Sequence, residues 1–197
     1  MTRVCDKLIM KSVFITGASG VGKSTTYHGL IDHGFAPSPS YITRPRRDSE
    51  HEGIDAYFIS TEQFATNMAA GFFLESTMSD AEYGGVYYGS PVQWEIDALS
   101  GSLFAAIPSN VISLRGLMRR FDDRNMRSSV LWVNLYASLE TRRERVLGYI
   151  SDPDQIQNRL YAGVGQGTKL DADINIDTGE HKVDQVLDAI LELTNGY

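Results

Sequence analysis

The segment from Gly17 to Ser24 constrains the fold of this chain more than any other part of the sequence. It reads G-A-S-G-V-G-K-S and matches the phosphate-binding pattern G-x-x-x-x-G-K-[ST] in full. The apolar run Ser12–Thr16 predicts a strand that enters the loop, and Gly22–His33 predicts a helix that leaves it, with Gly34 as its C-cap. A strand, a glycine loop and a helix in this order predict an α/β fold in which the loop surrounds a phosphate group.

The loop also predicts how a nucleoside triphosphate would be held. Its glycines allow backbone N–H groups to turn towards the β-phosphate of ATP, and the helix N-terminus adds a favourable dipole. Lys23 would reach the β- and γ-phosphates, and the hydroxyl of Ser24 would bind Mg²⁺. The expected ATP site comprises Gly17, Ala18, Ser19, Gly20, Val21, Gly22, Lys23, Ser24 and Thr25.

The rest of the chain alternates predicted strands and helices. Strands are expected where short apolar runs occur, at 102–107, 129–135 and 172–176. Helices are expected at 61–71, 91–99, 139–147, 152–163 and 182–194, and a loop or hairpin at 76–90. In the first helix, Thr61 is the expected N-cap, and Phe64 and Met68 share one face. This alternation predicts a parallel sheet flanked by helices on both faces.

The composition excludes several classes of partner and site. The chain has 197 residues and a net charge of −7, which argues against a nucleic acid or an acidic membrane as partner. Its one cysteine, Cys5, cannot form an internal disulfide, so a cytoplasmic location is expected. The apolar stretch Leu8–Thr16 is too short to span a membrane, and the four histidines lack the spacing of metal ligands.

Five further motifs occur in an order that resembles the guanylate kinase family. Thr43–Gly53 carries T-R-x-x-R-x-x-E-x-x-G, which is similar to the signature of that family. The other four motifs lie at Ser60–Phe64, Gly71–Glu75, Tyr87–Ser90 and Ile156–Leu160, and the resemblance extends from Val13 to about Leu191. It implies a single domain with a P-loop kinase fold, made of a core at 8–35 and 91–197, an acceptor-binding insert at about 36–90 and a helical lid at about 140–163.

The insert carries side chains that suit an acceptor with a phosphate and a guanine base. Arg44 and Arg47, with Ser40, can donate several hydrogen bonds to a phosphate dianion, and Tyr88 adds a phenolic donor. The carboxylate of Glu75 can accept both neighbouring donors of guanine, its N1–H and its amino group. By resemblance, the expected acceptor site comprises Ser40, Arg44, Arg47, Tyr57, Glu75, Tyr88 and Ser90.

The lid is expected to supply arginines that neutralise charge on the transferred phosphoryl group. Arg145 and Arg159 are the predicted catalytic arginines, together with Lys23 of the loop. Arg142 and Arg143 are interpreted as a solvated helix face. The turn after this helix, 147–149, contains no arginine, whereas the family commonly has one there.

Three departures from the family pattern affect the acceptor side. Ala56 stands at the family's tyrosine position, and the neighbouring Tyr57 should point to the opposite face of its strand. The family's acidic D-x-D aligns with Ile107–Ser109, which carries no carboxylate, although Ser109 or Asn110 could still hydrogen-bond a ligand. About four extra residues lie within 76–86 and change the wall of the acceptor pocket.

The resemblance implies ATP- and Mg²⁺-dependent phosphoryl transfer to a nucleoside monophosphate, with GMP or dGMP as the expected acceptor. Ribose 1,5-bisphosphate phosphokinase has a stretch similar to Tyr41–Arg44 and lacks the acidic pair, so another phosphorylated acceptor, or a modified nucleotide, is the alternative. A non-catalytic binding module is a third possibility, against which the intact Lys23 and Ser24 argue. Asp177 and Thr178 are expected to form a plain turn, with a backbone contact to adenine as the alternative.

Overall fold

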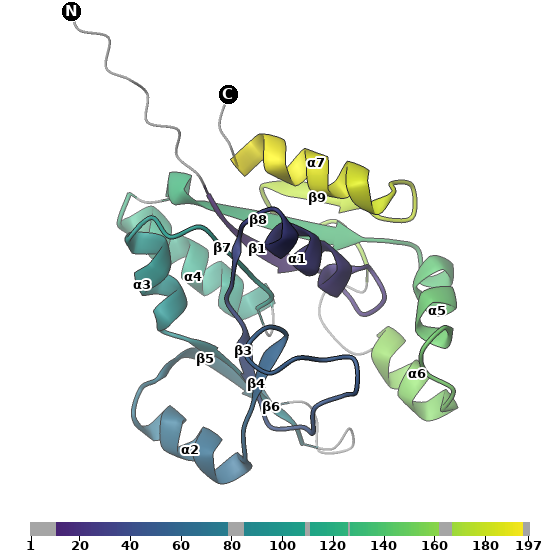
Figure 1. The fold of residues 1–197 in the computed structure, drawn as a ribbon, viewed down its shortest axis with the longest axis horizontal. Coiled ribbons are helices and arrows are strands. Elements are labelled where there is room, and N and C mark those ends of the chain that lie inside the picture. Colours follow the sequence, from purple (N-terminus) through teal and green to yellow (C-terminus); the bar gives the residue numbers. More distant parts are fainter. Residues whose placement is uncertain (1–10, 79–84, 109–110, 126, 162–166, 195–197) are drawn as a thin grey trace, which may run out of the picture.

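A computed structural model of the chain describes residues 11–78, 85–108, 111–125, 127–161 and 167–194. Its core is a parallel sheet of five strands in the order β2-β7-β1-β8-β9 (Figure 1). These strands are β1 (Ser12–Thr16), β2 (Ala36–Pro37), β7 (Phe104–Ala106), β8 (Val130–Tyr136) and β9 (Ile174–Asp177). The predicted parallel sheet is confirmed, and the strand that enters the phosphate loop lies at its centre.

Helices cover both faces of the sheet because alternate side chains of a strand point to opposite sides. Val13 and Ile15 of β1 pack beneath α1 and α7, whereas Phe14 packs against α3 and α4 on the other face. All three side chains are fully buried. The covering helices are α1 (Lys23–Asp32), α3 (Gln93–Leu99), α4 (Val111–Asp123) and α7 (Val183–Thr194).

Helix α4 corrects the sequence interpretation, which contains no helix between residues 107 and 129. The structure has α4 there, followed by a short 3-10 helix at Arg127–Ser129. Five apolar side chains of α4 recur with the period of a helix and are all buried: Val111, Leu114, Leu117, Met118 and Phe121. Gly116 in the middle of the run lowers its helix propensity, but burial of the apolar stripe outweighs that cost.

A second, smaller sheet lies below the core sheet in Figure 1, with strands in the order β4-β3-β6-β5. Strands β5 and β6 pair in antiparallel fashion, which confirms the hairpin predicted around residues 76–90. Residues 79–84 of that region lie outside the described part of the chain. The elements are β3 (Ser40–Ile42), β4 (Ala56–Phe58), α2 (Thr61–Ala69), β5 (Phe73–Met78) and β6 (Tyr87–Pro91).

The N-cap of helix α2 lies one residue before the predicted cap. Ser60, not Thr61, is the N-cap, since Ser60 has extended backbone angles and its side chain accepts a hydrogen bond from the N–H of Gln63. Phe64 is buried in the second sheet's aromatic cluster, but Met68 is 51% exposed. The prediction of Thr61 as the cap was therefore wrong, and only Phe64 of the predicted apolar face is buried.

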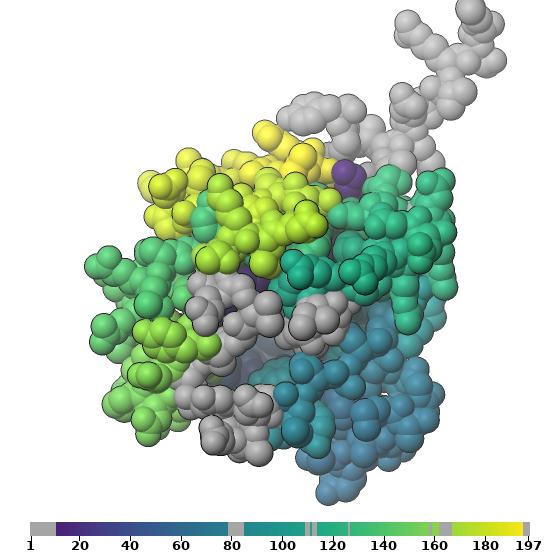
Figure 2. Space-filling view, turned by 180° about the vertical axis from the view of Figure 1, so that it is seen from behind, coloured from purple at the N-terminus to yellow at the C-terminus, as the bar shows by residue number. Residues whose placement is uncertain are grey.

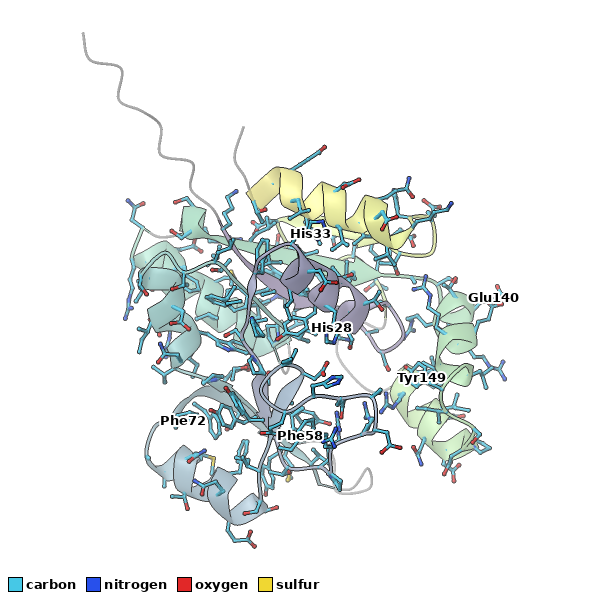
Figure 3. All side chains as sticks on the ribbon, in the orientation of Figure 1. His28, His33, Phe58, Phe72, Glu140 and Tyr149 are labelled. Carbon is cyan, nitrogen blue, oxygen red and sulfur yellow. The ribbon has the colours of Figure 1, made fainter. Side chains whose placement is uncertain are left out.

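The turn at residues 51–55 fastens the second sheet to the core. The hydroxyl of Tyr27 on α1 donates to the carbonyl of Ile54 at 2.6 Å. His28, on the side of α1 that faces the second sheet, lies 2.7 Å from the carboxylate of Asp55 (Figure 3). The helix that follows the phosphate loop is therefore bonded directly to the segment that carries the predicted acceptor residues.

Two short helices, α5 (Leu139–Leu147) and α6 (Pro153–Tyr161), lie at one end of the core sheet (Figure 1). Ser138 is the N-cap of helix α5, and its hydroxyl accepts a hydrogen bond from the N–H of Thr141. The last two residues of the helix predicted at 152–163 lie outside the described chain. Among the described residues, no helix combines the length and apolar character needed to cross a membrane.

Candidate active site

The phosphate loop follows β1 and requires glycine at two positions because other parts of the fold approach it closely. Gly17 and Gly20 have φ angles of 143° and 83°, a region that other residues rarely adopt. A Cβ atom at Gly17 would lie 2.3 Å from the carbonyl oxygen of Leu135, and one at Gly20 would lie 2.8 Å from that of Arg142. The loop is therefore held in a single shape between β8 and α5.

Lys23 lies at the first position of α1 and points back into the loop. Its ammonium donates to the carbonyl oxygens of Gly17 at 2.8 Å and Ala18 at 2.9 Å. Burial, and after it the nearby charges of Arg159 and Arg142, together lower the pKa of Lys23 from 10.5 to about 8. These positive charges gather at one place, which is the electrostatic arrangement that a polyphosphate would neutralise.

Arg145 braces the loop against the turn that follows β9. Its guanidinium donates to the carbonyl oxygen of Gly20 at 3.3 Å and to the hydroxyl and carbonyl oxygens of Thr178 at 3.0 and 2.6 Å. The hydroxyl of Thr178 in turn donates to the carbonyl oxygen of Val21 at 2.9 Å. Thr178 is buried, and the residues after Asp177 form the expected turn between β9 and α7, which also packs against the loop.

The other two arginines of α5 have opposite environments. Arg143 is exposed, as the sequence interpretation expected. Arg142 is only 2% exposed, so its interpretation as part of a solvated face was wrong. Its Nη1 donates to the carbonyl oxygen of Leu160 on α6 at 3.2 Å. The sequence alone could not predict the burial of Arg142, because which of two neighbouring arginines in a short helix is buried depends on how α6 packs against it.

Arg159 of α6 is close enough to Lys23 of the loop and to Arg47, one of the predicted acceptor residues, for its charge to act on both. Its guanidinium is 5.9 Å from the centre of the Tyr149 ring, which lies in the turn between α5 and α6 (Figure 3). Its charge lowers the pKa of Lys23 on one side and that of Arg47 on the other. A hollow between α6 and the second sheet is visible on the face shown in Figure 2.

Glu50 organises the two arginines of the second sheet. Its carboxylate accepts from both terminal nitrogens of Arg44, at 2.7 and 2.5 Å, and from the backbone N–H of Arg47 at 2.9 Å. Burial raises the pKa of Glu50, but these hydrogen bonds and the arginine charges outweigh that effect and lower it. The carboxylate therefore stays ionised and holds Arg44 in a two-pronged pair.

Arg44 and Arg47 respond differently to their surroundings. Burial lowers the pKa of Arg44, but Glu50 and the neighbouring Tyr88 raise it by more, and its guanidinium lies 5.4 Å from the Phe58 ring (Figure 3). The pKa of Arg47 is lowered, first by burial and then by the charges of Arg159 and Arg44. Arg47 is therefore the arginine of the pair that experiences net repulsion from other cations, which a phosphate dianion would relieve.

Glu75 and Ser90 lie opposite each other on paired strands, and the hydroxyl of Ser90 donates to Glu75 Oε1 at 2.6 Å. Thr77 pairs with Tyr88 two residues along, so Glu75 and Tyr88 share one face of the sheet. Ile42 pairs with Tyr88 in the same way. The structure thus brings the predicted base-reading pair and the predicted phosphate donor Tyr88 onto one surface.

Tyr57 lies on the opposite face of the sheet, and the hydroxyl of Ser40 is bonded to the core sheet. Tyr57 pairs with Tyr41 and stacks on its ring at 4.7 Å, on the face opposite Ile42 and Phe58. The structure therefore does not bring Tyr57 together with Arg44 and Tyr88. The hydroxyl of Ser40 donates to the carbonyl oxygen of Ile107 at 3.0 Å and so links the second sheet to the end of β7. Ser109 and Asn110, considered as substitutes for the acidic pair, lie outside the described residues.

Ser24 is the side chain whose chemistry fits a magnesium ion bound together with phosphates. It lies in the first turn of α1 and exposes its hydroxyl beside the loop. Mg²⁺ commonly takes one or two protein oxygens and completes its shell with phosphate oxygens and water, so a single hydroxyl is a sufficient protein contribution. Within the described part of the chain, no group of three His, Cys, Asp or Glu side chains could hold a metal on its own.

Comparison with known proteins agrees with this arrangement. Residues 9–100 match the guanylate kinase family. A guanylate kinase of Symbiobacterium thermophilum is 30% identical over 151 residues, which cover 75% of this chain and 67% of that protein. A guanylate kinase of Streptococcus agalactiae is 30% identical over 152 residues, 75% of this chain and 68% of that protein.

A solved structure gives the same result for the fold. The crystal structure of guanylate kinase from Anaplasma phagocytophilum superposes with a TM-score of 0.64 at 20% identity. The superposition covers 94% of this chain and 85% of that one. On the family match and the two relatives together, the chain belongs to the guanylate kinase family of P-loop nucleoside monophosphate kinases.

Proposed function

We propose that this kinase transfers the γ-phosphoryl group of ATP, in the presence of Mg²⁺, to GMP or dGMP. The observation that carries the proposal is the place of Arg159, whose charge acts on both Lys23 and Arg47. Lys23 belongs to the loop that would hold the donor, and Arg47 to the segment that would hold the acceptor. A cation whose charge acts on both segments suits a phosphoryl group that passes directly from one to the other.

The proposed transfer is a single in-line displacement without a covalent enzyme intermediate. The acceptor phosphate oxygen is already anionic, so the reaction needs no protein base. Lys23 and Arg159 would stabilise the negative charge on the transferring group, and Arg145 would keep the loop in shape through its bond to Gly20. When bound at Ser24, Mg²⁺ would supply further charge neutralisation on the donor phosphates.

On the acceptor side, the proposed phosphate ligands are Arg44, Arg47 and Tyr88, and the proposed base ligands are Glu75 and Ser90. The hydroxyl of Ser90 donates to one oxygen of Glu75, which orients the carboxylate. Guanine presents two adjacent donors to such a carboxylate, whereas adenine presents an acceptor at N1. This difference supports guanine as the base. A single cysteine and the nucleotide chemistry support a cytoplasmic setting for the reaction.

A second acceptor class has one observation in its favour. The segment after β7 begins Ile107–Pro108 and offers no carboxylate where the family pattern has an acidic residue. Ile107 instead uses its carbonyl oxygen to accept a hydrogen bond from Ser40. An acceptor without guanine, such as ribose 1,5-bisphosphate, or a modified nucleotide would not need a second carboxylate there.

An ADP-release assay with ATP and Mg²⁺ against a panel of acceptors tests the proposal. The panel contains GMP, dGMP, AMP, CMP, UMP, dTMP and ribose 1,5-bisphosphate, and Lys23→Ala is the inactive control. Turnover chiefly on GMP or dGMP is the expected result. Turnover on another member alone would exclude GMP and dGMP as acceptors but leave the chain a kinase. Absence of both turnover and ATP binding would refute the proposed reaction.

A further inference from the structure

Helix α5 presents two arginines one turn apart to the phosphate loop, and Arg142 is the one without a role in the proposed reaction. Its side chain is 2% exposed. The backbone of Arg142 lies so close to Gly20 that a Cβ added at Gly20 would come within 2.8 Å of the Arg142 carbonyl oxygen and 3.2 Å of its Cα. Helix α5 and the loop are therefore in direct backbone contact at Arg142.

The side chain of Arg142 extends from this contact to the lid helix α6. Its Nη1 donates to the carbonyl oxygen of Leu160 at 3.2 Å. Leu160 is 4% exposed and directly follows Arg159 in the chain. One residue thus touches the phosphate loop with its backbone and, with its side chain, bonds the Leu160–Tyr161 peptide in the same turn of α6 as Arg159.

The guanidinium of Arg142 is also enclosed by residues that follow the lid. A Cβ atom at Gly167 would lie 2.7 Å from Arg142 Nε and 2.7 Å from the carbonyl oxygen of Ala137. Burial lowers the pKa of Arg142, so the fold keeps a cation where its charge is disfavoured. An apolar side chain of similar size could fill this space at a lower desolvation cost. The cation is better explained by its hydrogen bond to α6 and by its charge near Lys23 than by packing alone.

We infer that Arg142 is a positioning residue for phosphoryl transfer, which holds Arg159 at the phosphate loop by bonding the Leu160 carbonyl while its own backbone packs against Gly20. The inference rests on the proposed function, because it assigns Arg142 an effect on the step that Arg159 assists. Arg142 itself does not touch the reacting atoms in this account. Its loss would shift Arg159 away from the transferring group and leave the ATP-binding loop intact.

A double-mutant cycle with Arg159 tests this coupling. Arg142→Met is expected to lower kcat about 100-fold, the scale expected for misplacing a charge-neutralising group by about 1 Å, and to change KM for ATP by less than about threefold. Arg159→Met should lower kcat by a similar or larger factor. Adding Arg142→Met to Arg159→Met should then lower kcat by less than about twofold, because the residue through which it acts is already gone.

The matched control is Arg143→Met, which removes a neighbouring exposed arginine of the same helix. It is expected to leave kcat and KM unchanged. If the effects of Arg142→Met and Arg159→Met multiply in the double variant, or if Arg142→Met retains full kcat, the inference is overturned. Arg142→Lys keeps a cationic donor and is expected to recover part of kcat. If Arg142→Met does not fold, the same cycle with Arg142→Lys decides the question.

Hydrogen exchange separates this inference from the proposed acceptor. ATP with Mg²⁺ should protect the backbone amides of α6 in the wild-type chain, and Arg142→Met should lose that protection while the amides of α5 keep theirs. Equal protection of α6 in both proteins would overturn the inference. A wild-type chain that turned over no acceptor would refute the proposed function, and the exchange experiment would still decide the role of Arg142.

Discussion

The lowered pKa of Lys23 predicts a specific dependence of stability on pH. The folded chain binds this proton with a pKa of about 8, against 10.5 for an unperturbed lysine. Between these two values the unfolded state holds the proton and the folded state does not, so the free energy of unfolding rises with pH. The slope is about 1.4 kcal/mol per pH unit, and the full difference amounts to about 3 kcal/mol.

Urea unfolding of the wild-type chain and of Lys23→Met between pH 7 and pH 10 measures this effect. Subtracting the two curves of unfolding free energy against pH removes the contribution of the other titrating groups, which both proteins share. Lys23→Met also loses the hydrogen bonds from Lys23 to Gly17 and Ala18. Their loss adds a difference in the free energy of unfolding between the two proteins that does not change with pH below about 8. From pH 8 to pH 10 the wild-type chain should gain about 2 to 3 kcal/mol relative to Lys23→Met. Lys182→Met, at an exposed position, should show no such gain.

The same pKa predicts proton uptake when ATP binds. Phosphate groups beside Lys23 favour its charged form, so binding at pH 8 should take up about half a proton per ATP. Calorimetry in two buffers with different ionisation enthalpies measures this number, and Lys23→Met should take up none. A stability difference that stays constant from pH 7 to pH 10, together with binding that takes up no proton, would refute the reasoning.

Three further variants probe other contacts of the site. Gly20→Ala places a Cβ on a residue with φ near 83°. We expect the free energy of unfolding in urea to fall by about 1 to 2 kcal/mol and calorimetry to show weaker ATP binding. Unchanged values would contradict the close packing of the loop. Glu75→Gln replaces the proposed acceptor of two guanine donors. We expect kcat/KM for GMP to fall about 100-fold in steady-state assays, and an equal fall for every active acceptor would argue against a role in binding the base. Arg44→Lys keeps the charge but loses the two-pronged pair with Glu50. We expect KM for the acceptor to rise about tenfold while KM for ATP stays constant. A rise in KM for ATP alone would show that Arg44 does not belong to the acceptor site.

The elements that carry strong local signals could be predicted from the sequence. The strand Ser12–Thr16, the loop after it and the helix Leu139–Leu147 agree with the structure almost residue by residue. Each has a signal in its own residues: a β-branched run before glycine, or a serine cap before a charged helix. The two adjacent hydroxyls Ser60 and Thr61 show the limit, because only the backbone angles decide which one caps the helix.

The remaining features depend on residues that are distant in the sequence. Whether Arg142 or Arg143 is buried depends on where α6 and Gly167 lie, which the helix itself does not encode. The position of Tyr57 was predictable, since an alternating strand turns it away from the face of Phe58. The helix Val111–Asp123 could also have been predicted, because its apolar residues recur with the period of a helix. It was missed because this part of the sequence was interpreted only for its missing carboxylates.

The central place of β1 in the core sheet has a consequence for how the chain is made. Val13 pairs with Ala105 and Ser12 pairs with Val130, so β1 leaves the ribosome about a hundred residues before its two partners. At a synthesis rate of about 5 to 20 residues per second, the nascent chain keeps this apolar strand unpaired for about 5 to 20 s. Pairing between such distant segments slows folding, and until it occurs the edges of the strand remain unpaired and prone to aggregation. Until β8 has emerged, we therefore expect the growing chain to expose an apolar strand with unpaired edges, the condition that favours aggregation during synthesis.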